Sequence, residues 1–135
     1  MFFFYNLITI FLYPFLIFLF FVRKFLKKES SDSLIDKLTL SKASGNKKRK
    51  KLIWFHAASI GEVQSIIPLV SKFYSNYNDL NFLITTSTIS SGKIVKKKIK
   101  DLDRANHKYL PLDISFLVNS FLNNWSPSLA VFVDS

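Results

Sequence analysis

The sequence has 135 residues and a formal net charge of +10, from 19 basic and 9 acidic side chains. This length suffices for one modest domain with its own core. The charge indicates an anionic partner, either a phosphate-rich lipid surface or a nucleic acid. Cysteine is absent, which excludes disulfides and thiolate metal sites.

The N-terminal segment is strongly apolar. Residues 2–22 include eight phenylalanines and no charged side chain. As a helix they would reach roughly 30 Å, the thickness of a bilayer core, and Pro14 can be tolerated in such a helix. Four basic residues follow between positions 23 and 28, and the positive-inside rule then places the C-terminal side in the cytoplasm. A cleaved signal peptide is the alternative, but its basic start, short apolar core and small-residue cleavage site are absent. We therefore predict an uncleaved single-pass transmembrane anchor.

Residues 23–50 are predicted to form a basic cytoplasmic connector. Within them Leu34, Ile35, Leu38 and Leu40 could form a short amphipathic turn on the membrane or the domain.

The run of basic residues from Lys47 to Lys51 has two interpretations. It could be a nucleic-acid patch or a juxtamembrane cluster, in which each basic residue gains ~1 kcal/mol near anionic lipid. The predicted anchor ends about 25 residues upstream, which favours the lipid interpretation. Binding to nucleic acid is disfavoured because no interleaved exposed aromatics and no known module accompany the lysines.

From Leu52 onward apolar runs alternate with amphipathic stretches. Strands are predicted over 52–57, 80–85, 107–110 and 129–133. Helices are predicted over 62–77, 92–101 and about 114–125. We expect Pro68 to bend the first helix or loosen one of its turns, and Asp113 to cap the last helix. The βαβαβαβ order with short connections predicts an α/β fold, a Rossmann-like parallel sheet with helices on both faces, over residues 51–135. In such sheets ligands bind at the C-terminal ends of the strands.

Glu62 follows the first predicted strand and has two interpretations. Ser59 to Glu62 has the form Ser-x-x-Glu of a capping box, in which the carboxylate only returns a hydrogen bond to the backbone. Alternatively, Glu62 is a general base that takes a proton from an acceptor hydroxyl in a cleft at the strand end. In that case Gly61 lets a substrate approach the backbone, and the neighbouring amides, including that of Ser59, could hold a phosphate or carboxylate.

A hydroxyl-rich loop over residues 85–92 follows the second predicted strand. It could bind phosphate or sugar, with Thr86, Thr88 and Gly92 as candidate contacts, or it could simply cap the next helix. It lacks the spacing of a P-loop. His56 and His107 lack the spacing of metal ligands, so no metal site is predicted.

The segment from Trp54 to Val63, Trp-Phe-His-Ala-Ala-Ser-Ile-Gly-Glu-Val, resembles the His-Ala-x-Ser-Val-Gly-Glu-Val motif of the 3-deoxy-D-manno-octulosonic acid (Kdo) transferases. Further blocks of that family are similar in the same order: Pro68 to Val70, Thr85 to Thr88 with Gly92, and Tyr109 to Asp113. Together with the anchor, the resemblance covers nearly the whole sequence.

The resemblance implies the N-terminal half of a GT-B glycosyltransferase of lipopolysaccharide biosynthesis at the inner membrane. Such an enzyme would move Kdo from CMP-Kdo to a lipid A precursor on the cytoplasmic side, without a metal or other cofactor. Glu62 falls on the family's proton-accepting glutamate. Ser59, Gly61, Thr86, Thr88 and Gly92 are the expected substrate-binding residues.

Two departures from the family pattern shape the functional prediction. The family's next acidic block would begin at Asp134 and Ser135, so its second glutamate and the C-terminal domain for CMP-Kdo lie outside these 135 residues. We expect the 135-residue chain alone to be inactive as a transferase. The alternative is a non-catalytic, membrane-anchored module that binds anionic lipid or a partner protein.

Overall fold

The structure is a computed structural model that describes residues 2–27, 30–38 and 51–134. Its centre is a four-stranded sheet in which every neighbouring pair is parallel, in the order β3-β2-β1-β4. The strands are β1 (Lys51–Ala57), β2 (Leu80–Thr86), β3 (Ala105–Tyr109) and β4 (Leu129–Val133). The helices are α1 (Phe2–Phe25), α2 (Ser31–Leu38), α3 (Ile60–Asn76), α4 (Ile89–Ile99) and α5 (Ser115–Trp125).

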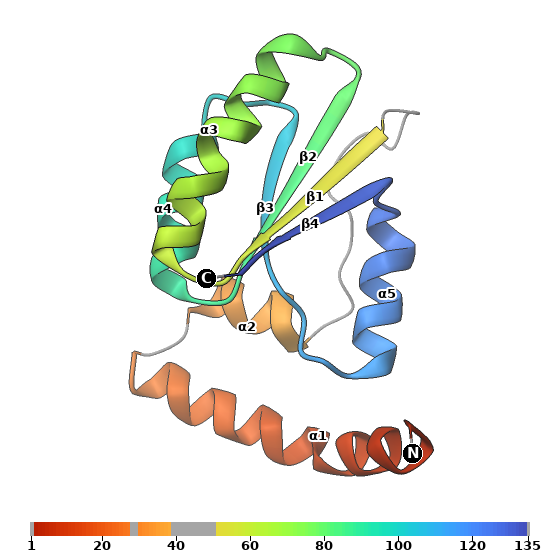
Figure 1. The fold of residues 1–135 in the computed structure, drawn as a ribbon. Coiled ribbons are helices and arrows are strands. Elements are labelled where there is room, and N and C mark those ends of the chain that lie inside the picture. Colours follow the sequence, from red (N-terminus) through yellow and green to blue (C-terminus); the bar gives the residue numbers. More distant parts are fainter. Residues whose placement is uncertain (1, 28–29, 39–50, 135) are drawn as a thin grey trace.

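Helices cover both faces of the sheet (Figure 1). α3 and α4 lie on one face and α5 on the other. Successive side chains of a strand point to opposite faces, so Phe55 packs in the core under α3 and α4, while the preceding Trp54 packs against Phe121 of α5. The predicted α/β fold, with a parallel sheet and helices on both faces, is confirmed.

The strand order reverses direction beside β1. The chain runs outward from β1 through β2 to β3, and α5 then returns it to β4 on the other side of β1. In open parallel sheets such a switch point, at the C-terminal ends of the strands, is where ligands bind. The C-terminal ends of β1 and β4 are therefore the first place to look for a site.

α2 packs against β3, the strand at the opposite side of the sheet from β4. The Asp36 carboxylate accepts a hydrogen bond from the Tyr109 backbone N–H (3.0 Å) and pairs with Lys108 (3.2 Å). Leu34 is buried, as expected for an amphipathic helix on the domain, whereas Ile35 is exposed. Leu40 and the basic residues 47–50 lie outside the described residues.

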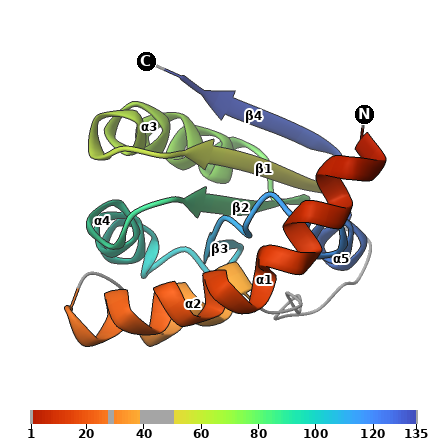
Figure 2. The same cartoon turned by 90° about the horizontal axis from the view of Figure 1, so that it is seen from below.

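α1 runs beneath the edge where the strands end (Figures 1 and 2). Near its start, the Tyr5 hydroxyl donates to the Asp113 carboxylate (3.2 Å), and Asn6 Oδ1 accepts from the Ser115 hydroxyl (2.5 Å). The Tyr13 ring meets Phe116 edge-on at 5.3 Å. Within the described residues, α1 alone is long and apolar enough to cross a membrane.

Two details of the helices differ from the sequence prediction. α4 begins at Ile89, three residues earlier than expected, because the Thr88 hydroxyl caps the Ser91 N–H. The prediction that Asp113 caps α5 was wrong: Ile114 occupies the N-cap position, and the Asp113 carboxylate binds Tyr5 instead. α3 continues as one helix past Pro68, and the bend or loosened turn expected there stays a prediction.

Candidate active site

The turn between β1 and α3 holds Glu62 at the switch point. Glu62 Oε2 accepts hydrogen bonds from the backbone N–H groups of Ala58 (2.7 Å) and Ser59 (3.3 Å), and the Glu62 N–H donates to Ser59 Oγ (3.3 Å). This is a complete capping box, and it leaves Glu62 only 8% exposed. The capping interpretation is confirmed. The box also fixes the carboxylate at the helix N-terminus, whose partial positive charge favours an anion.

The space next to this turn is open. Gly61 is exposed, and a Cβ added to it would meet nothing within 4 Å. Ser59 is also exposed, with its hydroxyl directed at the helix N-terminus. A ligand can therefore approach the backbone beside Glu62 without displacing a side chain.

β4 ends beside the same turn. Val133 is in register with Ala57, so Asp134 follows on the strand adjacent to the Ala58 turn. Asp134 is exposed. Glu62 and Asp134 thus follow neighbouring strands at the same end of the sheet.

The β2–α4 loop is tied to the Glu62 turn. The Ser91 hydroxyl lies 2.6 Å from Thr88 Oγ1 and 3.4 Å from the carbonyl oxygen of Ala58. Thr88 is exposed, whereas Thr86 is buried and its hydroxyl lies 2.8 Å from His107 Nε2. Of the two predicted threonine contacts, Thr88 faces solvent and Thr86 is occupied within the fold.

Gly92 has a packing role that the sequence did not reveal. It is buried, and a Cβ in its place would lie 2.6 Å from Cζ of the Tyr109 ring. Glycine therefore lets β3 and α4 approach each other here. A substrate contact at Gly92 stays a prediction.

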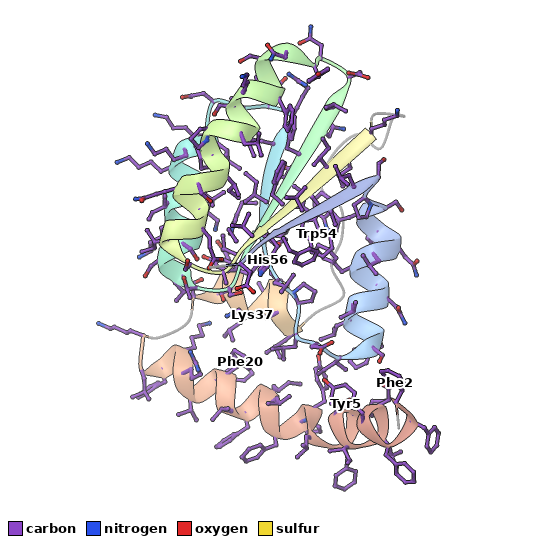
Figure 3. The ribbon with its side chains drawn as sticks, in the orientation of Figure 1. Phe2, Tyr5, Phe20, Lys37, Trp54 and His56 are labelled. Atoms are coloured by element: carbon purple, nitrogen blue, oxygen red, sulfur yellow. The ribbon has the colours of Figure 1, made fainter. Side chains whose placement is uncertain are left out.

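Two histidines near the strand ends were not predicted to belong to the site. His56 Nδ1 lies 2.9 Å from the Thr85 hydroxyl, which also accepts a hydrogen bond from Trp54 Nε1 (2.8 Å); Figure 3 labels His56 and Trp54. Burial lowers the pKa of His56. The pKa of His107 falls to about 4, mainly through burial and further through the charges of Lys96 and Lys108. Both rings are thus neutral at pH 7. Their pairing with threonines on a neighbouring strand depends on sheet register, which the sequence pattern did not specify.

A basic pocket lies beside the β2–α4 loop, between that loop, α2 and the C-terminal end of α1. Its volume is about 520 Å³. The residues that line the basic pocket are Arg23, Lys27, Lys37, Ser87, Thr88, Ile89, Ser90 and Lys93. Only Thr88 was among the predicted site residues, because the cations come from three separate segments. Among the described residues, no group of three His, Asp or Glu side chains could hold a metal ion.

Comparison with known proteins identifies the family of the sequence. Residues 32–135 match the family model described as 3-deoxy-D-manno-octulosonic-acid transferase (kdotransferase). The 3-deoxy-D-manno-octulosonic acid transferase of Rickettsia felis is 37% identical over 109 residues, which are 81% of this chain and 22% of the relative. That of Rickettsia bellii is 32% identical over 131 residues, 97% of this chain and 30% of the relative. That of Haemophilus influenzae is 36% identical over 83 residues, 62% of this chain and 19% of the relative.

The chain thus spans less than a third of the length of these curated relatives. No solved structure gave a significant match. The family match covers the whole sheet, the Glu62 turn and most of α2. The chain belongs to the 3-deoxy-D-manno-octulosonic-acid transferase (kdotransferase) family.

Proposed function

We propose that this chain forms the acceptor-binding part of a glycosyltransferase that moves Kdo from CMP-Kdo to a lipid A precursor. The observation that carries the proposal is the position of Glu62. Its carboxylate is held by two backbone N–H groups at the switch point of the sheet, next to open space over Gly61. The family match over residues 32–135 supplies the reaction class.

In this proposal Glu62 is the general base. It removes the proton from an acceptor hydroxyl while that oxygen bonds to the anomeric carbon of Kdo, and the bond from Kdo to CMP breaks with its electron pair leaving on CMP. The capping bonds use Oε2. They hold the carboxylate group in one orientation, and such positioning is what general-base catalysis requires. CMP-Kdo is proposed to bind to a second Rossmann-like domain, as in a GT-B architecture.

We assign membrane attachment to α1, as a single pass with the sheet on the cytoplasmic side of the inner membrane. Residues 2–22 contain 16 Phe, Leu, Ile or Val residues. Near the bilayer centre each of these side chains gains roughly 0.3–0.6 kcal/mol on insertion. Spanning would release the hydrogen bonds that Tyr5, Asn6 and Tyr13 make to the domain, at about 0.5–1.5 kcal/mol each. In this topology Arg23 lies at the cytoplasmic surface.

A hybrid enzyme tests the proposed function. Residues 1–135 would replace the corresponding part of the Rickettsia felis relative, and Kdo transfer to a lipid acceptor would be assayed in membranes. We expect transfer by the hybrid and its loss in Glu62→Ala, with acceptor binding retained. A non-catalytic binding module predicts acceptor binding by a folded hybrid that never transfers Kdo, and that result would reject the proposal.

A further inference from the structure

His56 stands at the end of a chain of hydrogen bonds that begins at Trp54. Trp54 Nε1 donates to Thr85 Oγ1 (2.8 Å), and His56 Nδ1 lies 2.9 Å from the same oxygen. Trp54 and Thr85 are both buried. The Phe132 ring packs against the other two rings, with its centre 5.0 Å from that of Trp54 and 5.6 Å from that of His56. A hydrogen bond on one side and a packed ring on the other hold the imidazole in one orientation.

The same network assigns the hydrogen of the neutral ring. An indole nitrogen can only donate, so the bond from Trp54 uses Thr85 Oγ1 as its acceptor, and the hydroxyl hydrogen of Thr85 needs an acceptor of its own. Within the described residues, the acceptor at this hydroxyl is His56 Nδ1. A hydrogen on Nδ1 would point at the same oxygen and leave the hydroxyl hydrogen of a fully buried side chain unpaired, which is costly. Nδ1 therefore accepts, and the ring carries its hydrogen on Nε2.

His56 carries this Nε2–H group close to the Glu62 turn. Figure 3 shows His56 at the end of the sheet that faces α2. His56 precedes Ala58, whose N–H holds the Glu62 carboxylate, by two residues, or roughly 7 Å of extended chain. The charge of Glu62 acts on the ring. His56 is half-buried, and in the described part of the chain Nε2 has no hydrogen-bond partner. The Nε2–H group is therefore available to a ligand that also reaches Glu62.

A neutral donor at this place suits an uncharged oxygen. Burial keeps the His56 ring neutral at pH 7, although the Thr85 backbone and the Glu62 charge favour its protonated form. An imidazolium beside Glu62 would lower the pKa of that carboxyl group and weaken it as a base, whereas the neutral ring does not. Phosphate and carboxylate groups pair more strongly with the charged donors of Arg and Lys. The ligand that fits His56 is therefore a hydroxyl or ether oxygen of a sugar.

We propose that His56 is a substrate-binding residue, whose Nε2–H donates a hydrogen bond to an oxygen of the acceptor sugar next to the hydroxyl that loses its proton to Glu62. Trp54 and Thr85 are positioning residues, because they fix the ring without touching the sugar. β1 is paired on both sides within the sheet, so the donor is oriented before the substrate arrives. This proposal deepens the proposed function and rests on it for the identity of the sugar.

The position of the ring hydrogen can be measured directly on the unmodified chain. Proton–nitrogen correlation spectra of the full chain in detergent, with isotope-labelled histidine, distinguish the two ring nitrogens, and His107→Gln assigns the signals because the sequence has two histidines. We expect the hydrogen of His56 on Nε2 at pH 7. Thr85→Ser should keep this preference and Thr85→Val should abolish it, whereas Thr86→Val, the same change at the next residue, should keep it. A hydrogen on Nδ1, or a preference that survives Thr85→Val, would overturn the proposal.

A matched pair of variants at His56 tests the contact with the sugar. The full chain would be labelled at a cysteine introduced by Ser75→Cys, at the far end of α3, and titrated in detergent with a lipid A precursor. Glutamine places its amide nitrogen near the position of Nε2, whereas asparagine reaches only that of Nδ1. The loss of one neutral hydrogen bond predicts roughly three- to tenfold weaker binding by His56→Asn and binding within about twofold by His56→Gln. Unchanged binding by His56→Asn, or equal losses in both variants, would overturn the proposal.

Kinetics of the hybrid enzyme separate this proposal from the proposed function. His56→Asn should raise KM for the lipid acceptor, leave KM for CMP-Kdo unchanged and keep kcat within about threefold, as the loss of uniform binding does. A raised KM for CMP-Kdo alone would overturn the assignment to the acceptor. A hybrid that binds the acceptor through His56 but never transfers Kdo would reject the proposed function and leave the role of His56 in binding supported.

Discussion

The capping and catalytic roles of Glu62 can be separated by two substitutions at that position. Glutamine retains a side-chain oxygen that can accept from the N–H groups of Ala58 and Ser59, as glutamine does in natural capping boxes. Alanine has no acceptor oxygen, so both N–H groups lose this hydrogen bond. The structure therefore predicts a stability difference between Glu62→Gln and Glu62→Ala, independent of any chemistry.

The expected size follows from the two bonds. The bond from Ala58 is short (2.7 Å), whereas the one from the exposed Ser59 is long (3.3 Å) and easily replaced by water. We therefore expect Glu62→Ala to lower the free energy of unfolding by about 1–2 kcal/mol, in the range measured for helix caps. Glu62→Gln should cost about 0.5 kcal/mol, for the lost charge at the helix N-terminus.

Thermal unfolding of the full chain in detergent, followed by near-ultraviolet circular dichroism of Trp54 and Trp125, measures this difference. For a domain of this size 1 kcal/mol corresponds to roughly 4–8 °C in Tm. Gln64→Ala, on the exposed face of the same helix, is the matched control and should leave Tm nearly unchanged. If Glu62→Gln lowers Tm as much as Glu62→Ala, the reasoning that an acceptor oxygen holds this turn is refuted.

Three further predictions concern other parts of the molecule. Gly61→Ala meets no neighbour and removes a helical glycine, so it should raise the free energy of unfolding by up to about 1 kcal/mol while slowing Kdo transfer by the hybrid. Gly92→Ala should instead lower Tm, because Tyr109 fills the space next to Gly92. Equal Tm values for the two variants would contradict this. The pKa of His107 is lowered from 6.5 to about 4, so the unfolded chain binds more protons between these values. The resulting contribution of His107 to the free energy of unfolding, about 3 kcal/mol, is present above pH 6.5 and lost as the pH falls to about 4. His107→Gln should therefore flatten the dependence of Tm on pH in this range. An unchanged slope would contradict the prediction. A cysteine from Phe3→Cys should react with an impermeant maleimide from the periplasmic side, whereas one from Lys100→Cys should react only after permeabilisation; the reverse pattern would refute the proposed topology.

The sheet could be predicted because each strand is a short apolar run and each helix carries an apolar stripe. β4 agrees with its predicted range, and the other strands differ from theirs by one or two residues at an end. The capping box was also predictable, since Ser59 and Glu62 are three residues apart and the interaction is local. Local signals failed where a distant residue took part. Asp113 has the chemistry of an N-cap, but Tyr5, 108 residues earlier, binds it.

The parts of the site that sequence reasoning missed depend on contacts between distant segments. Arg23, Lys37 and Lys93 belong to three helices, and no spacing along the chain indicates that they share a pocket. The packing of α2 on β3 through Asp36 likewise requires the folded sheet. The run ending at Lys51 was predicted to lie near lipid. Lys51 is the first residue of β1, and the start of that strand lies at the end of the sheet away from α1 (Figure 1).

The central claim is that the Glu62 carboxylate accepts a proton during Kdo transfer. The most direct measurement is the turnover number of the hybrid enzyme carrying Glu62→Gln, at saturating CMP-Kdo and acceptor, relative to the unsubstituted hybrid. Because glutamine can preserve the turn but cannot take up the proton, we predict a loss of about 10²–10⁴-fold with acceptor binding unchanged. A turnover number within about threefold of the unsubstituted hybrid would contradict the account and leave Glu62 as a helix cap alone.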